Sequence, residues 1–325
     1  MNLLITGSSG HLGEAIIREV KKTDHNFISI DIKPSEYTTH TGSITDRKLV
    51  NECMKNVDAV IHTATLHKPH VATHSHQDFI DTNISGTLVL LEEARTQGVK
   101  SFIFTSTTST FGDLLTPQKN EPAIWVTEKT QSIPKNIYGV TKSAAENLCQ
   151  LFYRNHNLPC LILKTSRFFP EEDDKKEIRE MYEDANSKAN EYLYRRVDIE
   201  DVVSAHLLAI DKAQKIGFSK YIISATTPFT KKELVELHSD ALSVVEKLFP
   251  DYKKLYKNWK MFPHIDRVYV NEKARTELGW KPKYDFSHVL NCLKEGKDFR
   301  SKLAIEIGRK GYHSTIFKSG PYPVH

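Results

Sequence analysis

Glycine, cysteine and long apolar runs are scarce in this chain of 325 residues, and each scarcity excludes a class of protein. The 14 glycines and 13 prolines are too few for collagen-like or low-complexity repeats. The four cysteines are far apart and form no C-x-x-C pair, so neither a zinc knuckle nor a redox dithiol is expected. No apolar run approaches the roughly 18 residues of a membrane span, and no basic-then-apolar leader opens the sequence. We therefore expect a cytoplasmic protein that does not contact a membrane.

An excess of charge of one sign is also missing. The chain has 45 basic and 41 acidic side chains, a formal net charge of +4. A nucleic-acid binder usually carries a larger and more clustered basic excess. We therefore expect the protein to bind a small-molecule substrate and not a nucleic acid.

Short apolar runs alternate with helix-period stretches through the first half of the chain. Residues 3–6, 27–31, 58–62, 101–105 and 159–164 predict strands, and residues 11–22, 45–55, 78–98 and 138–156 predict helices. This alternation is typical of an α/β fold with a doubly wound parallel sheet of the Rossmann type. We expect a dinucleotide-binding domain over residues 1–164.

The pattern loosens after residue 164. Helices are predicted over residues 202–210 and 231–248, a strand over 220–225, and a helix end with a turn at 278–282. The charge run at 171–176 predicts a solvated loop or helix face. We expect residues 165–325 to form a smaller, mixed α/β substrate-binding region. Some of its elements should return to the first sheet, and residues 311–325 should form an extended arm.

A glycine-rich turn, residues 6–13 (TGSSGHLG), joins the first strand to the first helix. Gly7, Gly10 and Gly13 permit a tight turn and a close approach of a pyrophosphate to the free N–H groups of the helix. Asp31 ends the second strand, where a carboxylate binds the adenosine ribose hydroxyls and repels a 2′-phosphate. The two features predict NAD rather than NADP, although Lys33 could soften that preference.

Tyr138 and Lys142 open a later helix four residues apart, which places both side chains on one helix face. A nearby ammonium favours the phenolate and lowers the pKa of a tyrosine, so Tyr138 could act as an acid or base. The hydroxyl-rich segment 105–110 (TSTTST) follows a strand about 30 residues upstream. In a doubly wound sheet these hydroxyls lie at the carboxyl end of a strand, where ligands bind.

Together these motifs resemble those of the extended short-chain dehydrogenase/reductases, specifically the NAD-dependent epimerase/dehydratase family. Residues 6–13 are similar to its T-G-x-x-G-x-x-G turn and residues 58–65 to its fourth-strand segment. Residues 83–87, 104–112 and 138–142 are similar to its N-x-x-G-T, S-S-x-x-V-Y-G and Y-x-x-x-K motifs, and 197–202 and 278–282 to later signatures.

The resemblance implies roles for individual residues. Tyr138 would transfer the proton, Lys142 would hold the nicotinamide ribose and depress the tyrosine pKa, and Thr107 would bind the substrate oxygen. Ser106 and Thr108 are the neighbouring alternatives to Thr107, and Asn83 would support the site. The residues expected to contact NAD are Gly7, Ser9, Gly10, His11, Leu12, Gly13, Asp31, Ile32, Ser43, Ile44, Thr63, Ala64, Thr65, Thr105, Tyr138 and Lys142.

The substrate region departs from the family pattern. Arg167 stands where nucleotide-sugar enzymes often have an asparagine, Arg195 lies near the position of a common pyrophosphate-binding arginine, and the stretch between them is short. We expect Thr107, Thr108, His67, Arg167 and Arg195 to be substrate residues. The first hypothesis is a nucleotide-sugar (UDP-hexose-like) epimerase or related dehydratase. The alternatives are a net NAD(P)-dependent dehydrogenase of a non-nucleotide alcohol or ketone, and a non-enzymatic dinucleotide sensor. By analogy with the family, we expect a homodimer.

Five histidines lie between positions 62 and 76, without a fixed ligand spacing. Imidazoles are common metal ligands, but His62 belongs to the fourth-strand motif. We therefore expect no metal site, and we expect His67 or His70 to line the substrate mouth.

Overall fold

The computed structural model describes residues 1–311, 313 and 317. The chain divides into two compact units, which we describe separately. The first, here called the sheet unit, comprises Met1–Thr110, Pro134–Thr165 and Val202–Tyr221. The second, here called the C-terminal unit, comprises Phe111–Ile133, Ser166–Asp201 and Ile222–His325.

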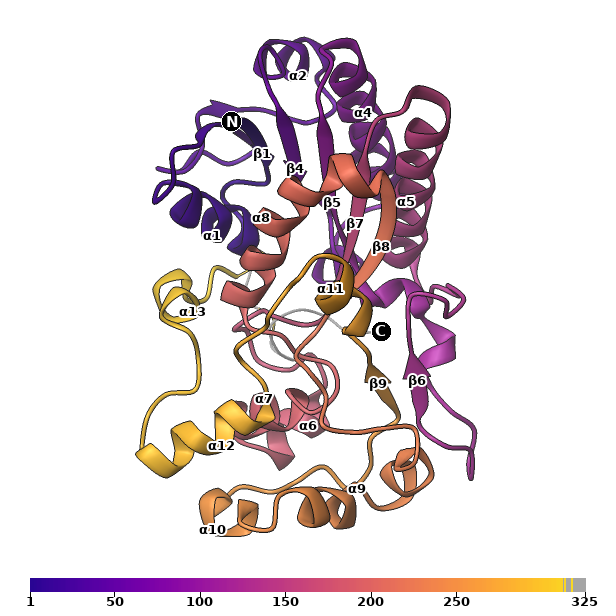
Figure 1. Cartoon of the computed structure of the whole chain (residues 1–325), viewed down its shortest axis with the longest axis vertical. Helices are drawn as coiled ribbons and strands as arrows, with labels where there is room; N and C mark the ends of the chain where they lie inside the picture. The colour runs from indigo at the N-terminus through magenta and orange to yellow at the C-terminus, as the bar shows by residue number, and fades with distance from the viewer. Residues whose placement is uncertain (312, 314–316, 318–325) are drawn as a thin grey trace. The chain divides into compact units, whose positions relative to one another are not determined.

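A seven-stranded sheet in the order β3-β2-β1-β4-β5-β7-β8 confirms the predicted doubly wound fold. Figure 1 labels β1, β4, β5, β7 and β8 of this sheet. The neighbouring strands from β3 to β7 pair in parallel, with Leu3 opposite both Phe27 and Ala59, and Phe102 opposite Cys160. The strands are β1 (Asn2–Thr6), β2 (Asn26–Asp31), β3 (His40–Thr41), β4 (Ala59–His62), β5 (Ser101–Thr107), β7 (Cys160–Thr165) and β8 (Phe218–Ile223). The strand order reverses between β1 and β4, and ligands bind beside such a reversal at the carboxyl ends of the strands.

Helices connect these strands and cover them with apolar faces. Helix α1, for example, buries Leu12, Ala15, Ile16 and Val20, and α4 and α5 pack against each other. Leucine, isoleucine, valine and phenylalanine side chains from the sheet, α2, α4 and α5 form one continuous core. The helices are α1 (His11–Val20), α2 (Arg47–Cys53), α3 (His76–Phe79), α4 (Gly86–Thr96), α5 (Ile137–His156) and α8 (Ile199–Ile216), with 3-10 turns η1 (Lys68–His70) and η3 (Thr108–Phe111).

The helix predicted over residues 78–98 is divided. After α3 the chain forms a π-helical segment, η2 (Ile80–Ser85), and only then continues as α4. A π segment shifts the following side chains around the helix axis, and such segments are frequent at functional sites. Apolar periodicity does not report this change of hydrogen bonding.

The C-terminal unit is built mainly from helices around an aromatic core, which includes Tyr182, Tyr192, Phe262 and Phe286. Its short strands β6 (Ile124–Val126) and β9 (Arg267–Tyr269) pair in parallel. Its helices are α6 (Lys176–Met181), α7 (Asp184–Glu191), α9 (Leu234–Leu248), α10 (Tyr252–Tyr256), α11 (Glu272–Glu277), α12 (Phe286–Glu295) and α13 (Lys302–Ile307), with the 3-10 turn η4 (Asp113–Leu115).

Two predictions for this unit need correction. Glu171, Asp173 and Asp174 are buried, whereas the other three residues of the run 171–176 are exposed, so the run is only partly solvated. Arg167 pairs with both aspartates. Helix α9 is interrupted at Asp240, which has non-helical angles and accepts hydrogen bonds from the Ser243 N–H and hydroxyl.

Most of the predicted C-terminal arm, residues 311–325, lies outside the described residues. In the described part of the chain, no helix is long and apolar enough to cross a bilayer. The same residues include no group of three or more His, Cys, Asp or Glu side chains placed to hold a metal ion.

Candidate active site

The turn between β1 and α1 is shaped by glycines at two positions. Gly7 has a φ of +77°, and a Cβ there would lie 2.7 Å from the backbone nitrogen of Ala64. A Cβ on Gly13 would lie 2.0 Å from the Gly7 carbonyl oxygen, so only glycine lets the helix approach the strand this closely. Gly10 is the exposed N-cap of α1 and makes no side-chain cap. The first N–H groups of a helix capped in this way are well placed for a phosphate.

Asp31 lies next to this turn at the end of β2. One carboxylate oxygen accepts a hydrogen bond from the Ser9 N–H at 2.9 Å, and the other accepts one from the Lys33 N–H at 2.9 Å. The carboxylate is therefore fixed against the glycine turn, and each oxygen keeps acceptor capacity for a ribose hydroxyl. The turn and this carboxylate fit a dinucleotide.

The segment after β4 lies against the same turn. The Thr63 hydroxyl donates to the Thr6 carbonyl at 2.7 Å, and the Ala64 N–H donates to the Thr6 hydroxyl at 3.2 Å. The Thr65 hydroxyl donates to Asn83 at 2.9 Å. These contacts bring residues 63–65 beside the glycine turn at the reversal of strand order.

The other expected NAD residues have varied surroundings. His11 and Leu12 are buried in the first turn of α1, and the Ile32 side chain is 68% exposed. The Ser43 hydroxyl shares a hydrogen bond with Thr45, whereas the Ile44 side chain packs in the apolar core. Only the backbone of Ile44 is therefore available to a ligand.

Asn83 ties the segment after β4 to the helix that carries Tyr138. Its side-chain oxygen accepts from the Leu66 N–H at 2.9 Å, and its amide nitrogen donates to the Leu66 carbonyl at 2.9 Å and to the Thr141 hydroxyl at 3.0 Å. Because Asn83 lies in the π segment, that change of helical geometry directs a buried amide to both partners.

Tyr138 is buried in the first turn of α5, and Thr107, the last residue of β5, lies close enough to lower its pKa. The two neighbours of Thr107 have other partners. The Ser106 hydroxyl donates to Glu146, and the Thr108 hydroxyl donates to the Thr165 carbonyl at 3.4 Å. Phe104 and Ser106 of β5 face α5, whereas Thr105 faces α8. Thr107 therefore meets Tyr138 from the last position of the strand and not from the face that α5 covers.

Lys142 follows Tyr138 by one helical turn and is also buried. Its ammonium lies 4.0 Å from the centre of the Phe104 ring. Burial lowers the pKa of Lys142 to about 7. Burial raises the pKa of Tyr138 to about 12, and Thr107 lowers it only in part. The expected depression of the tyrosine pKa is therefore not found, because desolvation of the phenolate outweighs the stabilisation around it.

The remaining predicted residues of the sheet unit form local contacts. The His67 ring lies 4.7 Å from the His70 ring, in an edge-on arrangement after β4. The Thr105 hydroxyl bonds His206 Nε2 at 2.8 Å. His206 Nδ1 lies 2.8 Å from the Val202 carbonyl, which can only accept. Nδ1 therefore carries the proton, and Thr105 donates to Nε2.

His62 is a buried structural histidine rather than a metal ligand. The Thr87 hydroxyl donates its only proton to the Asn83 carbonyl at 2.7 Å, so His62 Nε2 must donate to Thr87 at 3.0 Å. His62 Nδ1 then accepts from the Thr6 hydroxyl at 2.8 Å. Burial holds the pKa of His62 well below its usual value, in agreement with a neutral ring that links β1 to α4.

Glu146 was not identified from the sequence. It is buried one turn beyond Lys142 and accepts from Lys164 at 2.6 Å and Lys220 at 2.8 Å. The spacing Tyr138, Lys142, Glu146 continues one helix face. This four-residue repeat is the sequence feature that could have identified Glu146.

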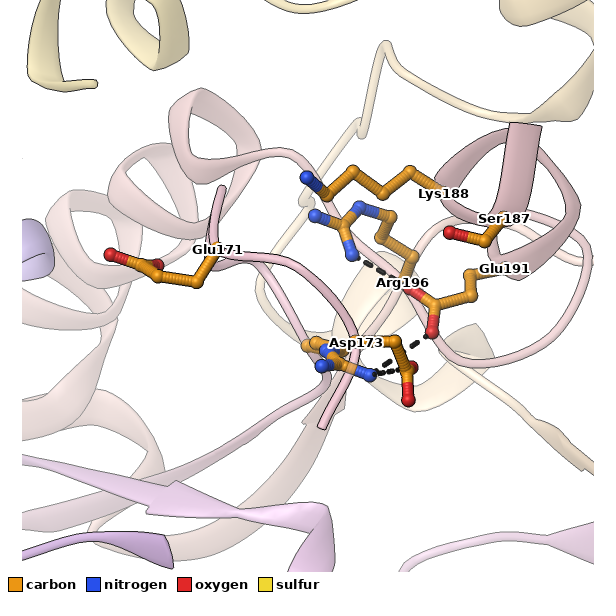
Figure 2. A pocket seen from close by; sticks show the side chains of 7 residues that line it. Glu171, Asp173, Ser187, Lys188, Glu191 and Arg196 are labelled. Carbon is orange, nitrogen blue, oxygen red and sulfur yellow. Dashed lines mark hydrogen bonds and ion pairs between the residues drawn. The ribbon is translucent and has the colours of Figure 1, made fainter. Parts of the chain in front are cut away.

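Arg167 and Arg195 lie in the C-terminal unit within a cluster of opposite charges. Figure 2 shows Asp173, Glu191 and Arg196 of this cluster. Arg167 bonds Asp173 at 2.5 Å and Glu191 at 3.3 Å, and Arg195 bonds Glu191 at 2.7 Å. Arg196 bonds the same Glu191 at 2.7 Å. A pocket in this cluster is lined by Arg167, Glu171, Asp173, Ser187, Lys188, Glu191 and Arg196. The two predicted substrate arginines are thus close together, and both are paired with carboxylates of the chain.

Comparison with known proteins agrees with this geometry. Residues 3–223 match the sequence model of the NAD dependent epimerase/dehydratase family. The chain belongs to this family. It is therefore an enzyme of the NAD-dependent type, and the glycine turn, Asp31 and the α5 tyrosine lie within the matched residues.

Relatives in the family include both dehydratases and epimerases. The chain is 27% identical to dTDP-glucose 4,6-dehydratase of Haemophilus influenzae, over 89% of this chain and 96% of that protein. It is 26% identical to UDP-arabinose 4-epimerase 1 of Arabidopsis thaliana, over 87% of this chain and 76% of that protein. Among solved structures, UDP-glucose 4-epimerase of Thermotoga maritima has a similar fold, with a TM-score of 0.63 at 22% identity, over 91% of this chain and 98% of that chain.

Proposed function

We propose that this enzyme is an epimerase of a sugar nucleotide, of the UDP-hexose class, with Tyr138 as the proton-transferring residue. The observation that carries the proposal is the buried arrangement of Tyr138, Thr107 and Lys142 at the carboxyl end of β5. All three are less than 10% exposed, and Thr107 is the side chain that opposes the effect of burial on the pKa of Tyr138.

In this proposal, Gly7, Gly10 and Gly13 would hold the pyrophosphate of NAD, and Asp31 would hold its adenosine ribose. Bound NAD supplies a hydride acceptor and, when hydride returns to the other face of the sugar, a donor. Thr107 orients the substrate oxygen. Tyr138 takes the hydroxyl proton as the carbinol carbon is oxidised, and it returns that proton when the carbonyl is reduced.

The pKa of Tyr138 determines which step of the proton transfer needs help from a neighbouring group. With a pKa of about 12, Tyr138 is protonated at neutral pH and is ready to donate. To accept a proton it needs a positive charge beside the phenolate, and Lys142 is the cation one helical turn away. We propose that a charged Lys142 lowers the free energy of the phenolate during proton transfer.

The ion pairs of the C-terminal unit favour a second candidate. Arg167 and Arg195 are both paired with Asp173 and Glu191, so neither offers an uncompensated charge to a substrate pyrophosphate. That arrangement suits a net dehydrogenase of a non-nucleotide alcohol or ketone, which exchanges its cofactor in each turnover.

Denaturing the purified protein and assaying the supernatant for NAD separates the two candidates. Retained NAD, together with a changed epimer ratio after incubation with UDP-glucose or UDP-arabinose and no net redox change, supports the epimerase. Loss of water from dTDP-glucose would instead indicate dehydratase activity. Protein that is purified without NAD and binds none of these nucleotides by calorimetry would contradict the sugar-nucleotide proposal.

Assembly as a homodimer and residence in the cytoplasm remain predictions from the family resemblance and the composition. Light scattering of the purified protein would test the first.

A further inference from the structure

A buried carboxylate continues the helix face that carries the proposed catalytic pair. Tyr138, Lys142 and Glu146 follow one another at intervals of four residues along α5, so they lie on one side of the helix. Lys142 is 2% exposed and Glu146 is 1% exposed. An ionised carboxylate is costly to bury unless its partners compensate it, so Glu146 needs an explanation.

Glu146 joins α5 to three strands of the sheet. One carboxylate oxygen accepts from Lys164 Nζ on β7 at 2.6 Å and from the Ser106 hydroxyl on β5 at 2.5 Å. The other accepts from Lys220 Nζ on β8 at 2.8 Å. Burial would raise the pKa of Glu146, but the two ammonium groups lower it below its usual value. The carboxylate is therefore ionised and held in one position.

Lys142 has few compensating groups of its own. Burial lowers its pKa, and the charges that raise it again are Glu146 first and then Cys149, both on α5. The Phe104 ring of β5 contributes a cation–π contact at 4.0 Å. On β4, His62 is neutral, and the Lys142 charge further lowers its pKa. Tyr138, the remaining titratable neighbour on the helix face, is protonated at neutral pH. Glu146 is thus the main source of negative charge for this ammonium.

We propose that Glu146 is a positioning residue for the reaction: its fixed carboxylate keeps the Lys142 side chain charged beside Tyr138. The inference rests on the proposed function in one respect, because the charge on Lys142 matters only if Tyr138 transfers a proton. An uncharged amine cannot stabilise a phenolate. Without the carboxylate, the pKa of Lys142 would fall below about 7, a smaller fraction of Lys142 would be charged at neutral pH, and Tyr138 would be a weaker base.

The arrangement predicts opposite effects for two neighbouring substitutions. Glu146→Gln keeps the size of the side chain and removes the negative charge, so the pKa of Lys142 should fall by about one pH unit. Lys220→Gln removes one of the cations that offset Glu146, while Lys164 still holds the carboxylate. The pKa of Lys142 should then rise. Both changes break the Glu146–Lys220 ion pair, and Glu146→Gln also breaks the pair with Lys164. A purely structural role for Glu146 would therefore weaken the fold in both variants without this difference in sign.

The direct measurement is a pH titration of lysine side chains by NMR, with 13C at the Cε position and Lys142→Arg to assign the signal. A lower pKa in Glu146→Gln and a higher one in Lys220→Gln is the expected result. An unchanged Lys142 pKa in Glu146→Gln, or a shift of the same sign in both variants, would overturn the proposal. If Glu146→Gln does not fold, Lys220→Gln alone decides, and no rise in its Lys142 pKa overturns it.

The pH dependence of turnover separates this inference from the proposed function. With UDP-glucose as the substrate, the alkaline limb of the rate profile should move to lower pH in Glu146→Gln and to higher pH in Lys220→Gln. If the NMR shifts appear but the wild-type enzyme turns over no sugar nucleotide, the substrate proposal fails and the control of Lys142 by Glu146 stands. If the enzyme turns over UDP-glucose but the alkaline limb of the rate profile stays at the wild-type pH in both variants, Glu146 has no part in positioning the reaction.

Discussion

Replacing Glu191 with glutamine should destabilise the C-terminal unit more than most single substitutions. Burial would raise the pKa of Glu191, but Arg195, Arg167 and Arg196 lower it from 4.5 to about 2. A difference of this size between the folded and unfolded states corresponds to about 3 kcal/mol of stability at neutral pH. Glu191→Gln also leaves three guanidinium groups with less compensation. Breaking a buried pair in this way typically costs about 3–5 kcal/mol.

The pH dependence identifies the cause of this loss. The folded pKa of Glu191 lies below its unfolded value, so its contribution is fully present above about pH 4.5 and is lost as the pH falls toward 2. Urea unfolding of the wild type and Glu191→Gln, followed by circular dichroism between pH 7 and pH 3, should therefore show a stability difference that narrows with acidification. If the difference in unfolding free energy between the two proteins stays constant over this pH range, the electrostatic argument is refuted and altered packing is the cause of the lost stability.

Two further predictions concern the cofactor and the proposed acid/base. Tyr138→Phe should reduce turnover of an accepted sugar nucleotide by more than 100-fold, on the order of the loss of a general acid/base. The NAD affinity of this variant, measured by calorimetry, should stay near the wild-type value. Turnover at the wild-type rate would show that Tyr138 is not the acid/base. Asp31→Ala should weaken the binding of NAD more than the binding of NADP. The change removes a hydrogen-bond acceptor for the ribose of NAD, and it also removes a negative charge that repels the 2′-phosphate of NADP. An unchanged ratio of the two dissociation constants would show that Asp31 does not select the cofactor.

The sheet could be predicted because its signals are local. Each parallel strand is a short apolar run, and each connecting helix repeats its apolar residues along one face. The short strands β3, β6 and β9 have only two or three residues and carry no such repeat. They form because distant segments meet them, as Arg267–Tyr269 meets Ile124–Val126.

The candidate site was predictable where a motif fixes the backbone and less so where it depends on side-chain direction. Gly7 and Gly13 are required by contacts of 2.7 and 2.0 Å that a Cβ would make. In contrast, the run Ser106, Thr107, Thr108 contains three hydroxyls, and which of them lies near Tyr138 depends on where β5 ends relative to the first turn of α5. Glu146 escaped prediction for a related reason, since its lysine partners are 18 and 74 residues away in sequence.

The charge cluster of the C-terminal unit shows why the substrate is harder to predict than the cofactor. In sequence, Arg167 and Arg195 are two cations near family substrate positions; in the structure, Asp173 and Glu191 occupy their guanidinium groups. A substrate diphosphate would have to displace these carboxylates or bind without them. Glu191→Gln removes one competitor, so it should bind UDP more tightly than the wild type in calorimetry if the arginines can receive a phosphate. Equal or weaker binding by the folded variant would favour a substrate without a nucleotide.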